Sequence, residues 1–241
     1  MLKSEFFRRI EKKYKLTKEE YEKMKLLIDR EFNEDKHGMS TICNLYFDSD
    51  DFILVRKSIE KPIYKEKVRL RSYQVPSYDS NVYLEIKKKY KGIVNKRRIV
   101  ISTEDMKKYL NDECEVKGQV FKEIDYIFKR YDLKPKVFIA YDRMAYFSKE
   151  NPNLRITFDF NIRYRTEDVG LENGDAGHLL LNDSECIMEI KTLDNLPYEF
   201  ARYLSTLNVY PTTFSKYGNV YKKINKINEK NKEEFYVWKY I

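Results

Sequence analysis

Four basic side chains recur at every second position of one short segment: Lys65, Lys67, Arg69 and Arg71. In a β-strand this spacing places all four on one face and turns apolar residues such as Val68 to the other. Like charges about 7 Å apart repel by about 2 kcal/mol for each neighbouring pair at an effective dielectric near 20. We therefore expect an anion opposite this face. The alternative is a strand whose charged side simply faces solvent.

The same alternation recurs on other candidate strands. Each has one face of basic residues with a few carboxylates and an opposite face of apolar residues. The charged faces hold Arg9, Glu11 and Lys13; Glu85, Lys87 and Lys89; Lys96 and Arg98; Arg143; Arg155, Thr157 and Asp159; and Glu189 and Lys191. This repetition makes a solvent-facing explanation less attractive, because a solvated sheet usually mixes both signs to avoid repulsion between strands.

A polyanion bound together with a divalent metal ion fits these faces better. Arginine forks and lysine ammonium groups match phosphate oxygens. The carboxylates of Glu11, Glu85 and Glu189 offer the oxygen ligands that Mg²⁺ and Mn²⁺ prefer. Taken singly, each of these glutamates is better explained as a salt-bridge partner. Because they share faces with the cations, we treat them as candidate metal ligands.

The composition indicates a basic, folded protein. The 241 residues carry a formal charge of +8, which favours nucleic acid, a phosphorylated small molecule or an anionic membrane as partner. Cys43, Cys114 and Cys186 are far apart and form no CxxC pattern, so a disulfide framework and a zinc site are disfavoured. We find no signal-peptide core and no run of about 20 apolar residues, and expect a cytoplasmic protein. His37 and His178 lie in loop-like sequence and are expected at the surface.

The elements that must position these charges are eight strands with helices between them. Strands are expected at 6–16, 41–47, 64–73, 82–89, 93–101, 137–147, 154–164 and 186–191. Helices are expected at 18–32, after the capping residues 48–50, and at 103–110, 119–130 and 197–207. No linker or repeat marks a boundary, so we expect one α+β domain over 1–241, with 222–241 as a C-terminal helix or tail. Eight antiparallel strands suit a closed β-barrel with helices packed outside and a charged interior.

Nine motifs, in this order along the chain, resemble those of a known family. They are Arg9-Ile10-Glu11-Lys12-Lys13-Tyr14, Leu45-Tyr46-Phe47-Asp48, Val68-Arg69-Leu70-Arg71, Leu84-Glu85-Ile86-Lys87, Lys96-Arg97-Arg98, Tyr141-Asp142-Arg143-Met144-Ala145-Tyr146, Leu154-Arg155-Ile156-Thr157-Phe158-Asp159, Met188-Glu189-Ile190-Lys191 and Ser215-Lys216-Tyr217. From about residue 6 to 221 the chain is similar to the VTC (vacuolar transporter chaperone) catalytic domain, one of the triphosphate tunnel metalloenzymes. Any one motif is common, whereas nine in the family's order are specific.

The resemblance implies an eight-stranded tunnel barrel that polymerises inorganic polyphosphate from the terminal phosphate of ATP with Mn²⁺ or Mg²⁺. By motif, the catalytic, phosphate-binding cations would be Lys13, Arg69, Arg71, Lys87, Lys96, Arg143, Arg155 and Lys216. Substrate-binding residues would be Tyr141, Ser215, Lys191 and Arg98, and metal ligands would be Glu189, with Glu85 and Glu11 as further candidates. A membrane protein is a further candidate partner of the domain.

Hydrolysis on the same fold is the first alternative. The ExExK opening of the related triphosphatases is only half present, since Arg9 stands where the first glutamate would be. This favours the polymerase branch over an inorganic or nucleotide triphosphatase. A terminal phosphate acceptor is already ionised, so in-line transfer needs no strong general base, in agreement with the lack of histidine on the expected strands.

A nucleic-acid binder without enzymatic activity is the second alternative. Base stacking needs aromatic side chains on the basic face. Tyr14 and Phe158 instead share faces with apolar residues. We therefore expect no nucleic acid partner.

Overall fold

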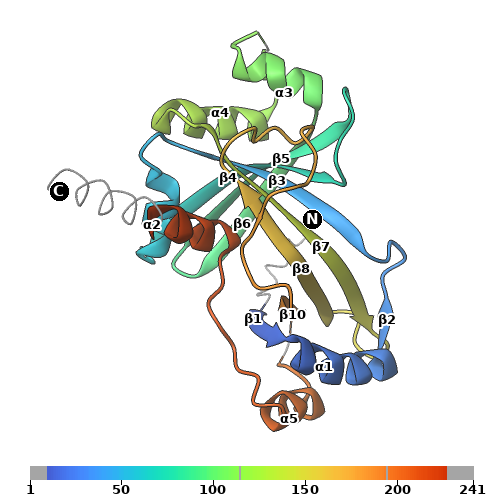
Figure 1. The fold of residues 1–241 in the computed structure, drawn as a ribbon. Helices are drawn as coiled ribbons and strands as arrows, with labels where there is room; N and C mark the ends of the chain where they lie inside the picture. The colour runs from blue at the N-terminus through green and yellow to red at the C-terminus, as the bar shows by residue number, and fades with distance from the viewer. Residues whose placement is uncertain (1–9, 114, 194, 227–241) are drawn as a thin grey trace, which may run out of the picture.

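The computed structural model describes residues 10–113, 115–193 and 195–226, in which strands and helices alternate (Figure 1). The strands are β1 (Ile10–Thr17), β2 (Phe32–Glu34), β3 (Ser40–Asp48), β4 (Tyr64–Tyr73), β5 (Asn81–Tyr90), β6 (Ile93–Ser102), β7 (Lys134–Ser148), β8 (Arg155–Arg165), β9 (His178–Leu179) and β10 (Glu185–Thr192). The helices are α1 (Lys18–Glu31), α2 (Ile53–Ile59), α3 (Thr103–Leu110), α4 (Gln119–Tyr131) and α5 (Tyr198–Thr206), with a further helix over 216–226. The expected strand start at 6–9, including Arg9, and the C-terminal stretch beyond 226 lie outside the described residues.

All eight expected strands lie in one sheet. They are hydrogen-bonded in the order β1-β10-β8-β7-β3-β4-β5-β6, while the short β2 and β9 pair with β7 and β8. Neighbouring strands are antiparallel, as predicted. The expectation of a closed barrel is not met, because β1 and β6 remain the two edges and no ladder joins them within the described residues.

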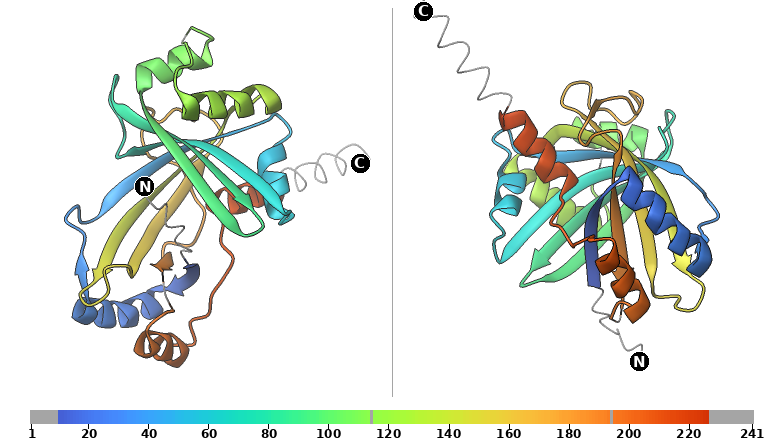
Figure 2. Two further views of the ribbon diagram at one scale, coloured as in Figure 1. Left: turned by 180° about the vertical axis from the view of Figure 1, so that it is seen from behind. Right: turned by 60° about the horizontal axis from the view of Figure 1, so that its bottom comes forward.

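A different part of the chain occupies the free edge of β1. The amide of Thr212 donates to the carbonyl of Lys13 at 2.7 Å and forms an isolated antiparallel bridge. Figure 2 shows the segment between α5 and the helix over 216–226 running alongside β1. The bridge occupies one main-chain position on the edge of β1 that a closing strand would use.

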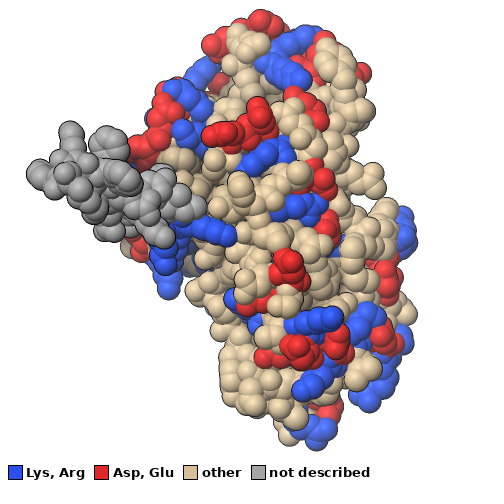
Figure 3. Space-filling model, in the orientation of Figure 1, with Lys and Arg blue, Asp and Glu red and all other residues tan. Residues whose placement is uncertain are grey.

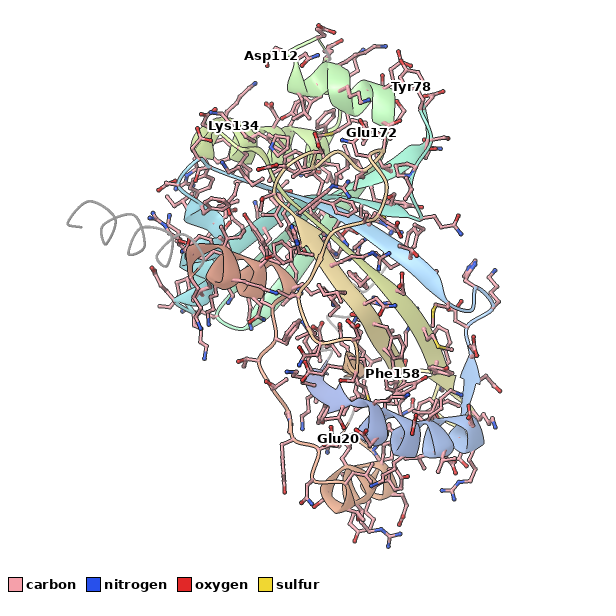
Figure 4. All side chains as sticks on the ribbon, viewed as in Figure 1. Glu20, Tyr78, Asp112, Lys134, Phe158 and Glu172 are labelled. Carbon is pink, nitrogen blue, oxygen red and sulfur yellow. The ribbon has the colours of Figure 1, made fainter. Side chains whose placement is uncertain are left out.

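The apolar faces of the strands lie under the helices, as predicted. On one half of the sheet, Val68 and Ile86 pack with α3 and α4. On the other half, Tyr14 and Phe158 pack with α1 and α5, and Phe158 lies beside α1 in Figure 4. These helices cover one side of the sheet and leave the opposite, concave side to the charged faces.

Polar side chains fix the starts of two helices. Thr17 opens α1 with a capping box, in which its hydroxyl accepts a hydrogen bond from the amide of Glu20 and the Glu20 side chain accepts one from the amide of Thr17. The carboxylate of Asp48 accepts hydrogen bonds from the amides of Leu54 and Val55 at 2.8 and 3.0 Å, and from the Tyr217 hydroxyl at 2.8 Å. Asp48 thereby joins the end of β3 to α2 and to the last described helix.

The concave side has an apolar end and a charged end. At the apolar end, Ile139, Tyr141 and Ile187 cluster with Tyr217 and Val220 of the last described helix. The helix over 216–226 fills the apolar end of the concave side. The charged end therefore remains for a ligand. None of the described helices is long and apolar enough to cross a lipid bilayer.

Candidate functional site

The basic faces of the strands meet on the concave side of the sheet. The register places Lys67, Lys87 and Lys96 in one row across β4, β5 and β6, and Arg69, Glu85 and Arg98 in the next row. In the other half, Arg143 lies opposite Asp159 and Lys13 opposite Glu189. The charge on Lys13, from β1, acts on both Lys67 and Lys87. The curvature of the sheet therefore brings its two halves together although the ladder is open.

Glu85 is the centre of one ion-pair cluster. This side chain is 2% exposed, with Arg69 Nη2 at 2.7 Å from Oε2 and Lys96 Nζ at 2.5 Å from Oε1. Burial would raise the pKa of Glu85, but Arg69, Arg71 and Lys96 outweigh burial and lower the pKa to about 2. Both carboxylate oxygens face cations, so Glu85 holds Arg69 and Lys96 in place, and the metal-binding role expected for it stays a prediction.

A second cluster is built around Asp159, which is fully buried. Arg143 donates two hydrogen bonds to its carboxylate, at 2.6 and 2.8 Å, and Lys216 Nζ lies 2.5 Å from Oδ2. Burial opposes ionisation, but the two cations outweigh burial and hold the pKa of Asp159 well below its usual range. The alternation placed Asp159 on a charged face without a role, and the structure shows that it fixes Arg143 and Lys216 side by side.

Tyr141 lies between these clusters. Its hydroxyl accepts a hydrogen bond from Arg71 Nη2 at 3.1 Å. Its ring centre is 5.1 Å from Arg143 Cζ and 4.2 Å from Lys216 Nζ. Burial would raise the pKa of Tyr141, yet Arg71, Arg143 and Lys216 lower it to about 8. The surroundings of this hydroxyl are therefore strongly positive, as a site for an anion requires.

Glu189 is the glutamate that best fits a metal ion. It is 7% exposed, and Lys191 Nζ lies 2.7 Å from its carboxylate. Burial would raise the pKa of Glu189, but Lys191, Lys13 and Arg143 lower it to about 2. Glu11 is 3.3 Å from Lys13 Nζ in the same part of the site.

Protein donors alone do not form a metal cage here. No group of three or more histidine, cysteine or acidic side chains suited to a metal ion occurs in the described part of the chain. Mg²⁺ is commonly held by one or two carboxylates together with substrate phosphates. Glu189, with Glu11 nearby, fits such a shared site.

Three cations of the site pair with no carboxylate in the part of the chain that the structure describes: Lys67, Lys87 and Arg71. Lys67 Nζ contacts Ser215 Oγ at 3.0 Å. Burial lowers the pKa of Lys67 and of Lys87, and neighbouring cations lower both further, while Glu11 and Glu189 offset part of this effect at Lys87. Sequence reasoning placed Lys67 on the basic strand but left it out of the binding residues, because none of the quoted motifs includes it.

Two of the expected residues lie at the margins of the site. Arg155 Nη2 is 3.7 Å from Asp35 Oδ2, and its Cζ is 4.7 Å from the centre of the Phe147 ring. The Cζ of Arg98, an exposed side chain, lies 4.6 Å from the ring centre of Tyr83. Neither arginine takes part in the two ion-pair clusters.

The concave side carries more positive than negative charge. Nine basic side chains gather at its centre, namely Lys13, Lys67, Arg69, Arg71, Lys87, Lys96, Arg143, Lys191 and Lys216, together with the four carboxylates of Glu11, Glu85, Asp159 and Glu189. With all nine protonated, this central group has an excess of five positive charges, in a setting where solvent screens repulsion only in part. The face of the molecule seen in Figure 3 mixes both signs. A multivalent anion is therefore the ligand that the concave side fits.

Comparisons with known proteins agree with this geometry. The model of the family described as VTC domain matches residues 8–225. Subunit 4 of the vacuolar transporter chaperone complex of Trypanosoma brucei brucei is 26% identical over 166 residues, which is 56% of this chain and 21% of that protein. The corresponding subunit of Trypanosoma cruzi is 23% identical over 163 residues, which is 55% of this chain and 20% of that protein. The matched part is thus about a fifth of the length of these relatives.

Solved structures show the same fold at low identity. A candidate adenylate cyclase from Bacillus halodurans has a TM-score of 0.53 at 14% identity, covering 86% of this chain and 93% of that chain. A candidate adenylyl cyclase from Hippeastrum with a dominant triphosphatase activity has a TM-score of 0.51 at 13% identity, covering 87% and 93%. At these identities the likeness is one of fold.

Proposed function

Because this chain belongs to the VTC domain family, with its triphosphate tunnel fold, we propose that it is a polyphosphate polymerase. It transfers the γ-phosphoryl group of ATP to the end of an inorganic polyphosphate chain bound on the concave side. One observation carries the proposal: nine basic side chains converge there against four carboxylates, and three of them pair with no carboxylate among the residues that the structure describes. Such a face is electrostatically tolerable when a multivalent anion occupies it.

The transfer is an in-line displacement at the γ-phosphorus. A terminal oxygen of the polyphosphate chain forms the new bond to phosphorus, the bond to the bridging oxygen of ADP breaks, and ADP leaves with the electron pair. The acceptor oxygen is already ionised, so no side chain has to remove a proton. Arg143 and Lys216, held in place by Asp159, stabilise charge on the transferred group, because donors fixed before the reaction need no rearrangement during it.

Glu189 would hold the divalent metal ion, with phosphate oxygens as its remaining ligands. The bound ion would neutralise part of the charge on the phosphates. Lys191 and Lys13, which lower the pKa of Glu189, keep this carboxylate ionised at neutral pH. Glu11 is the second carboxylate within this part of the site.

Triphosphate hydrolysis is the second candidate function. It is favoured by the structural likeness to the Hippeastrum protein with triphosphatase activity. Water would then replace the phosphate acceptor and would need a group to orient or deprotonate it. Each described carboxylate of the site is paired with a cation, and Arg9 replaces the first glutamate of the triphosphatase motif, which is why we place hydrolysis second.

The test is incubation of the purified protein with ATP and Mn²⁺, followed by gel electrophoresis with polyphosphate staining and an orthophosphate assay. Long stained chains that a polyphosphate-specific phosphatase removes support polymerisation. Orthophosphate without chains supports the triphosphatase. Arg71→Ala serves as the impaired variant, and Lys88→Met, which changes a lysine paired with Glu123 away from the site, serves as its matched control. Neither product from the wild-type protein would overturn both proposals.

The two trypanosome relatives are named as subunits of a complex. The chain matches about a fifth of the length of these relatives. We therefore carry over only one general expectation, that a partner protein binds this chain. Co-purification of the tagged chain from its own cells, with mass spectrometry of the retained proteins, tests this expectation. A chain recovered alone under gentle conditions would contradict it.

A further inference from the structure

Lys67 stands in the middle of the basic strand β4 and points to the concave side. Its Nζ lies 3.0 Å from Ser215 Oγ, a hydroxyl that also accepts a hydrogen bond from the amide of Gly218 at 3.1 Å. Ser215 thus caps the last described helix and meets Lys67 at the same point. A lysine, a serine hydroxyl and a helix start at one place form a set of donors suited to a phosphate group.

The charged groups with the largest effects on the pKa of Lys67 are all cations. Lys65 and Arg69 flank it on β4, and Lys87 lies opposite on β5. Lys13 faces it from β1. Phe47 of β3 lies opposite Val68 of β4, and the next residue of β3 is the carboxylate Asp48.

Asp48 is already engaged elsewhere. It accepts hydrogen bonds from the amides of Leu54 and Val55 and from the Tyr217 hydroxyl. Lys67 therefore differs from Lys96, Lys191 and Lys216 of the same site, each of which lies within 2.7 Å of a carboxylate oxygen.

Building on the proposed function, we infer that Lys67 is a further phosphate-binding residue and that it takes up a proton when a phosphate chain binds beside Ser215. In the empty site the Lys67 amine lies against the Ser215 hydroxyl, with no anion beside it. In the occupied site the ammonium donates to a phosphate oxygen, and the Ser215 hydroxyl is released to donate to the same group. The site thereby adds one positive charge when its anion arrives.

The surroundings of Lys67 determine whether it takes up or releases a proton when phosphate binds. Burial, then Lys65, Lys13, Lys87 and Arg69, lower the pKa of Lys67 to about 7. At pH 8 about nine-tenths of the free protein then carries a neutral amine. Phosphate oxygens favour the charged form and raise this pKa, so binding above pH 7 draws a proton from the buffer. Below about pH 6 the ammonium is already present, and binding draws almost none.

Isothermal titration with tripolyphosphate, free of metal, tests the inference. Titrations at pH 8 in three buffers of different ionisation enthalpy give the number of protons taken up. Wild-type protein should take up close to one proton more than Lys67→Met, because protons exchanged by tripolyphosphate itself are common to both. Lys67→Arg should bind tripolyphosphate without the extra proton. Lys88→Met, on the opposite face against Glu123, should behave as wild type.

Different results would overturn the proposed function and the proton uptake by Lys67. Absence of tripolyphosphate binding to the wild-type protein would overturn the proposed function. Binding with equal proton numbers in wild type and Lys67→Met would overturn the inference and leave the proposed function standing. If Lys67→Met misfolds, Lys67→Arg provides the same test. A Lys67→Arg protein that retains the wild-type proton uptake would overturn the inference. At pH 6, Lys67→Met should also bind about tenfold more weakly than wild type.

Discussion

Replacing Asp159 with asparagine removes the carboxylate that holds both Arg143 and Lys216. The side chain is fully buried and accepts two hydrogen bonds from Arg143 at 2.6 and 2.8 Å, while Lys216 Nζ lies at 2.5 Å. Asparagine has nearly the same shape but no charge. The variant therefore leaves two cations close together without compensation.

The expected loss is large because this carboxylate is desolvated. Removing one partner of a buried ion pair costs about 3–5 kcal/mol, and the retained amide oxygen places Asp159→Asn near the lower value. A chain of 241 residues has an unfolding entropy of about 0.5 kcal/mol/K, so a loss of about 3 kcal/mol lowers the melting temperature by about 6 °C. The unfolding free energy that ionised Asp159 adds to the wild-type protein is present above the unfolded pKa of aspartate. It is lost as the pH falls through the depressed pKa of Asp159.

Differential scanning calorimetry at pH 7 measures this effect. Asp50→Asn is the matched control, because Asp50 also faces two cations, Lys134 at 2.7 Å and Lys136 at 3.2 Å, but its side chain is 66% exposed. The control should have the same melting temperature as the wild-type protein, because solvent screens exposed ion pairs. An Asp159→Asn protein that melts within 1 °C of its parent, roughly the effect of a surface substitution, would refute the reasoning.

Four further outcomes follow from the site. Arg69→Ala should lower the rate of ADP formation from ATP by about 10²–10³-fold, as expected for loss of one fixed donor, and a rate within about twofold of wild type would contradict this. Glu85→Gln should be less stable at pH 7 and should lose less stability on acidification, because the wild-type contribution of Glu85 is present above its unfolded pKa of 4.5 and disappears as pH falls through about 2; chemical denaturation at several pH values measures the difference. Glu189→Gln should raise the Mn²⁺ concentration for half-maximal activity by about tenfold, equal to about 1.4 kcal/mol, and an unchanged requirement would remove Glu189 from the metal site. Tyr217→Phe should cost about 2 kcal/mol of unfolding free energy in urea, because its hydroxyl no longer donates to buried Asp48, and a variant of equal stability would show that this hydrogen bond contributes nothing.

Strand positions could be predicted well from the sequence because alternation reports directly on a half-buried strand. The predicted bounds of β4 and α3 coincide with the observed Tyr64–Tyr73 and Thr103–Leu110. The apolar partners of the charged faces also lie under helices as expected, with Tyr14 and Phe158 buried beside α1. Local patterns carry this information because each residue's face depends only on its immediate neighbours.

Closure of the sheet could not be predicted in the same way. Alternation states which side of a strand is apolar, but it does not state which main-chain groups occupy an edge. The amide of Thr212, far along the chain from β1, pairs with Lys13 and occupies one main-chain position that a closing strand would use. The expected barrel was wrong, because no ladder joins β1 to β6 within the described residues, while the convergence of charge on one side of the sheet is present.

Within the site, the sequence indicated which side chains share the concave side but not how they pair. Asp159 and Lys67 were both placed on charged faces without a role. Their roles depend on distances between strands, such as Asp159 to Lys216 at 2.5 Å and Lys67 to Ser215 at 3.0 Å, which no spacing within a strand encodes. Arg155, expected with the central cations, lies instead at the margin against Asp35.

The contacts of Ser215 and Lys216 set an order of assembly during translation. All eight main strands precede these residues in the chain, yet Lys67, Asp159 and the edge of β1 each find a partner in residues 212–216. A nascent chain on the ribosome can therefore form the sheet before it can form the complete anion site. Until Lys216 emerges, Asp159 can pair with Arg143 but not with Lys216, so this ion-pair cluster is completed only after the sheet has formed.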